Sequence, residues 1–363
     1  MTGKLLSIMA GTAAGIAALA GTGFAQDKDA TPAPFVAPAP IVVPAPVIAG
    51  PILKTPQEAG HAGPNINQRI DKTLKDAGAI PADPPDFAYG AFQRGFFLTA
   101  FALALENAKR GDAKSQTLLG ELLARGLGVR RDQGEAAGWY ELAAQNGDPE
   151  AQYALAQFYL DGRGVEKNLS RAADYLEKAG KNGHSDALRE LAYLLLEGKG
   201  REKNPLLAAA YLYRAADAGD MDAQYALAGL FMEGVGVAQS EENATRWYAK
   251  AARNGHTGAQ IEYAIMLFNG TGIDKDEAVA AMWFRHAAES GNPVAQIRLA
   301  KLIAEGRGVE KNEAEAVRWY RQARKKGIRD DDLETLSVTL SLQQPNVAVD
   351  ETDDSRIVDS GEE

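Results

Sequence analysis

Apolar residues recur along the chain at helical spacing, in pairs of faces that are separated by glycine-rich turns. In residues 147–183 the first face stands at i, i+4, i+7 and i+8, in Ala151, Leu155, Phe158 and Tyr159. The second face follows in the same unit, in Ala172, Tyr175, Leu176 and Ala179. The pattern predicts two amphipathic helices in each unit, named helix A and helix B below.

Start and stop signals stand at fixed places around both helices. Gly147 is typical of the residue that follows a helix C-cap, and Asp148 followed by Pro149 is typical of a helix start. Asn168 is the corresponding cap of helix B. The same slot holds a good cap former in every other unit: Asp132, Asn204, Ser240, Asp276 and Asn312.

The two-helix unit recurs with a period of 36 residues. A repeat glycine marks each unit, at Gly111, Gly147, Gly183, Gly219, Gly255, Gly291 and Gly327. A G-x-G pair after helix A recurs with it, at Gly126/Gly128, Gly162/Gly164, Gly198/Gly200, Gly234/Gly236, Gly270/Gly272 and Gly306/Gly308. Self-similarity at this period is typical of solenoids. The sequence therefore predicts an all-α fold, a right-handed α-solenoid of helix pairs with disordered N- and C-terminal segments.

One slot of helix B carries every tryptophan of the chain: Trp139, Trp247, Trp283 and Trp319. In the remaining two units this slot holds Tyr175 and Tyr211. Small residues, such as Ala244 and Ala251 around Trp247, suit close packing of helices against a large ring. We interpret the slot as core filler and not as an aromatic binding platform.

The recurring strings A-x-x-x-L-A-x-x-Y-x-x-G-x-G-V and A-x-x-W-Y-x-x-A-A-x-x-G resemble the Sel1-like repeat, a relative of the tetratricopeptide repeat. The resemblance covers residues 111–327 and is weakest in residues 184–219, where Leu188 replaces the usual Gln and Arg201 the usual Val. The chain is also similar to exported Sel1-repeat proteins of alphaproteobacteria, some of which regulate a membrane sensor kinase. The resemblance implies a scaffold that binds proteins.

The segment before the repeats has the layout of a signal peptide and a linker. Lys4 precedes an apolar run over residues 5–20, and a small-residue site ends at Ala25, which predicts a signal peptide over residues 1–25. An uncleaved membrane anchor is the alternative. Twelve of the 16 prolines fall within the predicted disordered linker, residues 26–85. The predicted localisation is the periplasm, or secretion from the cell.

Residues 86–110 read as N-terminal capping helices, and residues 328–363 as a helix remnant followed by an acidic disordered tail. The net charge is −10, and residues 330–363 hold 11 acidic residues against Arg356 alone. The tail therefore accounts for the whole net charge. A neutral body lacks the basic surface that nucleic-acid binding requires.

We find no constellation in the sequence that predicts catalysis, a cofactor or a metal site. The chain has no cysteine and four histidines, of which His184 and His256 occupy the same slot of two repeats, 72 residues apart. The G-x-G pairs follow helices and lack the lysine of a phosphate-binding loop. An enzyme related to β-lactamases is the alternative, but the strings S-x-x-K and K-T-G are absent.

Helix A is expected to line the concave face of the array, as in tetratricopeptide repeats. Its inward positions lie six, ten and 13 residues after the repeat glycine, and the candidate partner-binding residues among them are Tyr153, Tyr193, Tyr225, Met232, Ile261, Ile265, Phe268 and Ile297. We hypothesise a groove for a helix or an extended peptide. Two alternatives stay open: neighbouring repeats bury these positions, or the chain's own residues 336–342 fill the groove.

The sequence thus favours a non-enzymatic adaptor or regulator of a membrane or envelope partner. A β-lactamase-like or penicillin-binding protein and a secreted factor that binds a host component are the alternatives. The partner is predicted to be a protein or peptide, without nucleic acid, and signal cleavage would leave no transmembrane segment.

Overall fold

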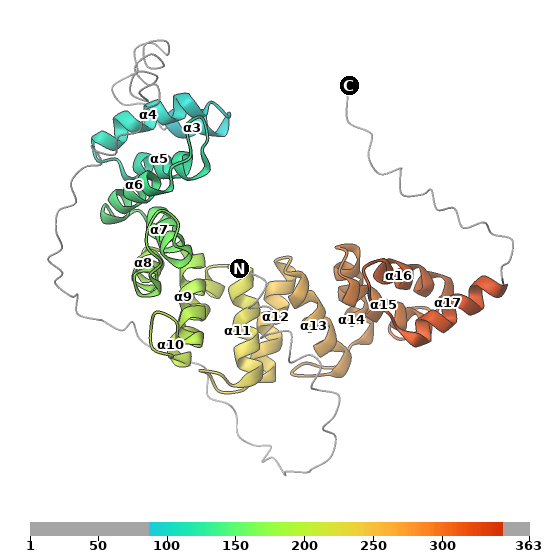
Figure 1. Cartoon of the computed structure of the whole chain (residues 1–363). Coiled ribbons are helices and arrows are strands. Elements are labelled where there is room, and N and C mark those ends of the chain that lie inside the picture. The colour runs from blue at the N-terminus through green and yellow to red at the C-terminus, as the bar shows by residue number, and fades with distance from the viewer. Residues whose placement is uncertain (1–86, 344–363) are drawn as a thin grey trace. The chain divides into compact units, whose positions relative to one another are not determined.

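The computed structural model describes residues 87–343. The predicted signal peptide, proline-rich linker and acidic tail lie outside the described residues. The chain divides into two compact units, whose described parts are residues 87–239 and 240–343. Each is treated by itself below, as unit 1 and unit 2. The described part of the chain forms 15 helices and no strand, which confirms the predicted all-α fold (Figure 1).

Unit 1 is a succession of helices in which each packs against the next. They are α3 (Phe87–Gln93), α4 (Phe97–Lys109), α5 (Ala113–Arg125), α6 (Gln133–Gln145), α7 (Pro149–Asp161), α8 (Leu169–Lys181), α9 (Ser185–Glu197), α10 (Pro205–Asp217) and α11 (Met221–Glu233). Helices α5, α7, α9 and α11 are helix A of successive repeats, and α6, α8 and α10 are helix B. Helices α3 and α4 precede the first repeat.

Unit 2 continues the same plan. Its helices are α12 (Glu241–Arg253), α13 (Thr257–Asn269), α14 (Glu277–Glu289), α15 (Pro293–Glu305), α16 (Glu313–Lys325) and α17 (Asp331–Gln343). Helices α13 and α15 are helix A of two repeats. Helix α17, which lies within the helix remnant predicted at the start of residues 328–363, packs against α16 and places Leu333 in the core with Leu336 beside it. The segment therefore continues the stack at its C-terminal end.

The caps of every helix B stand where the sequence predicts them, and helix A is capped at one fixed position of the repeat. Every helix B begins at a capping side chain that accepts a backbone N–H, from Asp132 in α6 to Asn312 in α16. Helix A is capped by the residue after the repeat glycine: Asp112, Asp148, His184, Asp220, His256 and Asn292. Each such cap contributes about 1 kcal/mol to helix stability. The 36-residue spacing thus fixes where each helix begins.

The second glycine of each G-x-G pair is required by packing as well as by backbone conformation. Gly164 has a φ of 66°, and a Cβ atom there would lie 2.1 Å from the carbonyl oxygen of Gln133 at the start of α6. Gly308 in unit 2 meets Glu277 O at the same 2.1 Å. The turn after helix A therefore sits directly on the first turn of the preceding helix B.

The tryptophan slot is less buried than the sequence suggested. Trp247 is 7% exposed, whereas Trp139, Trp283 and Trp319 are half-buried at the edge of the core. The next residue along helix B is buried in every repeat, and it lies deeper than the tryptophan slot in all of them except beside Trp247: Tyr140, Leu176, Leu212, Tyr248, Phe284 and Tyr320. The core-filler interpretation is thus correct for Trp247. In the other repeats that carry a tryptophan, its ring packs at the edge of the core, and the residue that follows it in the chain lies inside the core.

Candidate protein-binding surface

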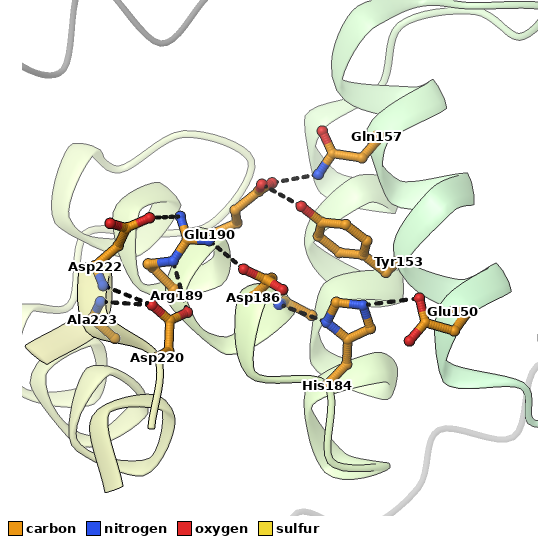
Figure 2. A network of polar contacts seen from close by, with 11 residues as sticks. Glu150, Tyr153, Gln157, His184, Asp186, Arg189, Glu190, Asp220, Asp222 and Ala223 are labelled. Carbon is orange, nitrogen blue, oxygen red and sulfur yellow. Dashed lines mark hydrogen bonds and ion pairs between the residues drawn. The ribbon is translucent and has the colours of Figure 1, made fainter. Parts of the chain in front are cut away.

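Tyr153 is held between two repeats of unit 1. It is half-buried on α7, its ring stacks on the imidazole of His184 with centroids 4.3 Å apart, and its hydroxyl donates to Glu190 Oε1 at 2.8 Å (Figure 2). Gln157 Nε2 donates to the other oxygen of Glu190 at 2.5 Å. Burial and the charge of Glu190 raise the pKa of Tyr153, so its hydroxyl remains a donor. One face of α7 is thereby tied to α9.

His184 serves as a helix cap. Its Nδ1 accepts the backbone N–H of Ala187 at 3.3 Å, and its Nε2 lies 3.5 Å from Glu150 Oε2 on α7 (Figure 2). His256 caps α13 in unit 2 in the same way, with Nδ1 accepting from Ala259 N at 2.9 Å. Both histidines therefore have a structural role that their shared slot in the sequence did not reveal.

Arg189 on α9 faces three carboxylates, of which Asp220 and Asp222 belong to the start of α11. Its Nε donates to Asp220 Oδ2 at 2.9 Å, it also pairs with Asp186, and Asp222 lies 4.0 Å away (Figure 2). Asp220 in turn accepts the backbone N–H groups of Asp222 and Ala223 as the cap of α11. Burial opposes the charge of Arg189, but the hydrogen bond and charge of Asp220 outweigh it, so the pKa of Arg189 is raised.

These contacts follow one rule in unit 1. The residue six positions after a repeat glycine contacts the cap of the next helix A: Thr117 Oγ1 donates to Asp148 Oδ2 at 2.7 Å, Tyr153 stacks on His184, and Arg189 pairs with Asp220. The rule was not predicted from the sequence. The sequence signal that could have revealed the rule is a pair of complementary residue types 31 positions apart, such as Arg189 and Asp220.

The other candidate residues of unit 1 lie on helix A and are half-buried. Tyr193 on α9 is half-buried, and burial is the main cause that raises its pKa to about 12. Tyr225 and Met232 on α11 are also half-buried. The face therefore presents edges of side chains, not whole rings, to an approaching partner.

The helix A face of unit 2 is formed by α13 and α15 and is mainly aliphatic. Ile261 is buried, Ile265 and Ile297 are half-buried, and Val294 is 46% exposed. Phe268 is half-buried, and the guanidinium of Arg307 covers its ring at 4.2 Å from the centroid. Of the four candidate residues here, Ile265 and Ile297 are therefore the most accessible to a partner.

A second set of contacts between repeats explains the weakest unit of the sequence. Gln152 Nε2 donates to Ala144 O at 3.1 Å, and Asn182 Nδ2 donates to Gln152 Oε1 at 3.0 Å. Gln116 and Asn146 repeat this arrangement. In the next unit all three slots change together, to Leu188, Gly180 and Ala218.

The substitution at Leu188 is accommodated by a glycine. A Cβ atom on Gly180 would lie 2.3 Å from Leu188 Cδ2, so the alanine that other repeats carry in this slot has no room beside leucine. Leu188 itself is buried. An apolar contact thus replaces the hydrogen-bonded pair at this junction, and the repeat keeps its packing although it departs from the usual residues.

The part of the chain that the structure describes contains no group of three or more His, Cys, Asp or Glu placed to hold a metal ion. Within residues 87–343, every helix is too short or too polar for a membrane span. What the geometry defines is a stack of helix pairs whose helix A side chains bridge successive repeats. This is the class of helical-repeat scaffolds.

The chain belongs to the Sel1 repeat family. The family model matches six consecutive segments that together cover more than half of the chain: residues 113–148, 149–184, 185–220, 222–256, 257–292 and 293–328. The predicted family and its six repeats are thereby confirmed. Proteins of this family commonly mediate protein–protein interactions and are generally non-catalytic scaffolds.

Two solved structures share the fold. A protective antigen of uropathogenic Escherichia coli strains is 26% identical, with a TM-score of 0.62, over 77% of this chain and 57% of its own. A Sel1 repeat protein from Oxalobacter formigenes is 28% identical, with a TM-score of 0.57, over 67% of this chain and 97% of its own. The chain thus spans little more than half of the E. coli protein. A search of curated proteins gave no match.

Proposed function

We propose that this protein is a non-enzymatic adaptor or regulator that binds a protein partner through the helix A faces of its repeats. The observation that carries the proposal is the aliphatic face of α13 and α15, where Ile265 and Ile297 are only half-buried and Val294 is exposed. Apolar side chains that several repeats leave accessible on one face are typical of interaction sites. Family membership supports the same interpretation.

The proposed compartment is the periplasm, with a membrane or envelope protein as partner. Support comes from the signal-peptide layout of residues 1–25 and the proline-rich stretch after it. Fractionation of cells that express the full chain tests this proposal, because a periplasmic protein is released with the periplasmic fraction and a cytoplasmic one is not.

The binding experiment compares two double variants of the full chain in pull-downs from envelope extract. Ile265→Ala with Ile297→Ala trims the helix A face. Leu206→Ala with Met282→Ala is the matched control, because these side chains are 67% and 63% exposed on helix B. Partners identified by mass spectrometry should be lost with the first variant and kept with the second. Equal recovery of every partner by both variants, with both folded, would contradict the proposal.

A second candidate function is a secreted or surface factor. It is favoured by the likeness to the E. coli structure, which is described as a protective antigen. The two candidates differ in where the mature chain accumulates. Retention in the periplasmic fraction supports the adaptor, and recovery from the culture medium or the cell surface supports the factor.

A further inference from the structure

Glu262 lies within the aliphatic face of unit 2. It is half-buried on α13 next to Ile261, and Ile265 follows one helical turn later on the same side. Across from it, α15 carries Ile297 and the exposed Val294. The carboxylate is thus half-buried on a face whose neighbouring candidate side chains are aliphatic.

Throughout residues 87–343 no side chain or backbone group gives Glu262 a hydrogen bond or an ion pair within 4.0 Å. The cation that acts on it, Arg298 on α15, lies beyond that distance and is exposed to solvent. Burial raises the pKa of Glu262, and the charge of Arg298 lowers it by a smaller amount. The carboxylate is therefore held in surroundings that disfavour its charge.

The same position in another repeat holds a glutamate whose carboxylate does have hydrogen-bond donors. Glu190 also lies seven residues after its repeat glycine, and it accepts hydrogen bonds from Tyr153 and Gln157. The other cation on the face of unit 2, Lys301, is already paired with Asp330 at 2.7 Å. Glu262 is consequently the acidic group of this face that is free to receive a donor from outside.

We propose that the helix A face of unit 2 binds a protein segment in which a lysine or arginine is flanked by aliphatic residues, and that this cation pairs with Glu262. The aliphatic side chains of the segment would contact Ile265, Ile297 and Val294, and would exclude water from the ion pair. Charge complementarity of this kind supplies specificity more than bulk affinity. The inference rests on the proposed function, and it adds the chemistry of the partner to it.

Peptide display on the full chain tests the inference while the partner is unidentified. A library of random 12-residue peptides is panned separately on the wild type, on Glu262→Gln and on Glu262→Lys. We expect wild-type binders with a basic residue between aliphatic ones, loss of the basic residue with Glu262→Gln, and its replacement by an acidic residue with Glu262→Lys. Glu310→Gln is the matched control, because it removes an exposed acid from a turn outside this face.

A selected peptide is then measured by fluorescence polarisation, together with its version in which norleucine replaces the basic residue. Either Glu262→Gln or the norleucine change should weaken binding about tenfold, and the two together should weaken it no further. Additive losses would overturn the pairing. Circular dichroism melts establish that each variant is folded.

The outcomes separate this inference from the proposed function. If binding of the enriched peptides depends on Ile265 and Ile297 but the peptides lack a basic residue, the proposed partner chemistry would be wrong and the proposed binding face would still be supported. If no enriched peptide depends on Ile265 or Ile297 for binding, both the proposed partner chemistry and the proposed binding face would be wrong. Enrichment of the same sequences on wild type and Glu262→Gln would overturn the pairing alone.

Discussion

The helix A faces of the two units share a backbone plan and differ in how their side chains are used. In unit 1 the residue six positions after the repeat glycine is Thr117, Tyr153, Arg189 or Tyr225, and the first three contact the cap of the next helix A. In unit 2 the same position is Ile261 or Ile297. Polar bridges therefore occupy one face, and aliphatic side chains line the other.

The position three residues after the repeat glycine shows the same contrast. It is acidic in three repeats of unit 1, at Glu150, Asp186 and Asp222, and it is Gly258 or Val294 in unit 2. Acidic side chains at this position pair with His184 and Arg189 in unit 1, and unit 2 has no acid at this position. The comparison teaches that the stack is specified by layers common to all repeats, while the chemistry of the helix A face is set by positions that vary from one repeat to the next.

The largest effect is expected at the layer that both units share. Gly164→Ala and Gly308→Ala should each destabilise the fold by about 3 kcal/mol, because the new Cβ atom overlaps a carbonyl oxygen and φ stays positive. Urea unfolding followed by circular dichroism measures this. Gly147→Ala is the control, since it has a positive φ but no atom within 4 Å of the added Cβ, and should cost about 1 kcal/mol. Equal losses at Gly147 and Gly164 would contradict the packing argument.

A smaller loss is expected for Arg189→Ala, which removes the polar bridge of unit 1. Asp220, whose side chain is almost fully buried, would lose its charged partner, and the free energy of unfolding should fall by about 2 kcal/mol. Lys301→Ala in unit 2 is the comparison, because its pair with Asp330 is more exposed, and should cost less than about 1 kcal/mol. A larger loss at Lys301 would reverse the contrast between the faces.

Two variants of His184 distinguish its role as a helix cap from its stacking on Tyr153. His184→Ala removes both the cap and the stacking on Tyr153, and should cost about 1 kcal/mol or slightly more. His184→Asp restores the cap with the residue that Asp148 and Asp220 provide in the same slot, so it should recover most of that loss. Thermal melts of the two variants measure the difference. If both variants melt together, the cap makes no contribution of its own.

Much of the fold could be predicted from the sequence because it is encoded in short strings. The cap at Asn168, the helix end before Gly147 and the face that includes Leu155 each follow from neighbouring residues. The tryptophan slot was assigned less accurately, since a shift of one residue round a helix moves Trp139 from the centre of the core to its edge. Periodicity alone does not resolve that shift.

The candidate binding surface was harder to predict because its shape depends on contacts between repeats. Position within the repeat correctly placed Ile265 and Ile297 on helix A, but it could not show that Arg307 covers Phe268 or that Tyr153 is tied to Glu190. Both partners lie more than 30 residues away in the chain. Glu262 was overlooked because it stands between apolar candidates and carries no motif.

The smallest effect is expected at Glu262, and it would sharpen the comparison most. Burial raises the pKa of this carboxyl above its value in the unfolded chain, so its charge weakens the fold at neutral pH and the penalty fades as pH falls through the raised pKa. Glu262→Gln should therefore melt slightly higher than the wild type at pH 7, and the two should converge near pH 4. Melting temperatures measured across this range check the expectation.

For Glu277 in the same unit, the pKa is shifted in the opposite direction to that of Glu262, so its charge stabilises the fold. Hydrogen bonds from Arg307 and Lys275 lower its pKa to about 2, so its contribution to stability is present above pH 4.5 and is lost as the pH falls towards 2. Glu277→Gln should thus melt lower than the wild type at neutral pH and approach it in acid. A Glu262→Gln variant that behaved like Glu277→Gln would mean that Glu262 is stabilised within the chain, and the carboxylate would then have no need of a partner's cation.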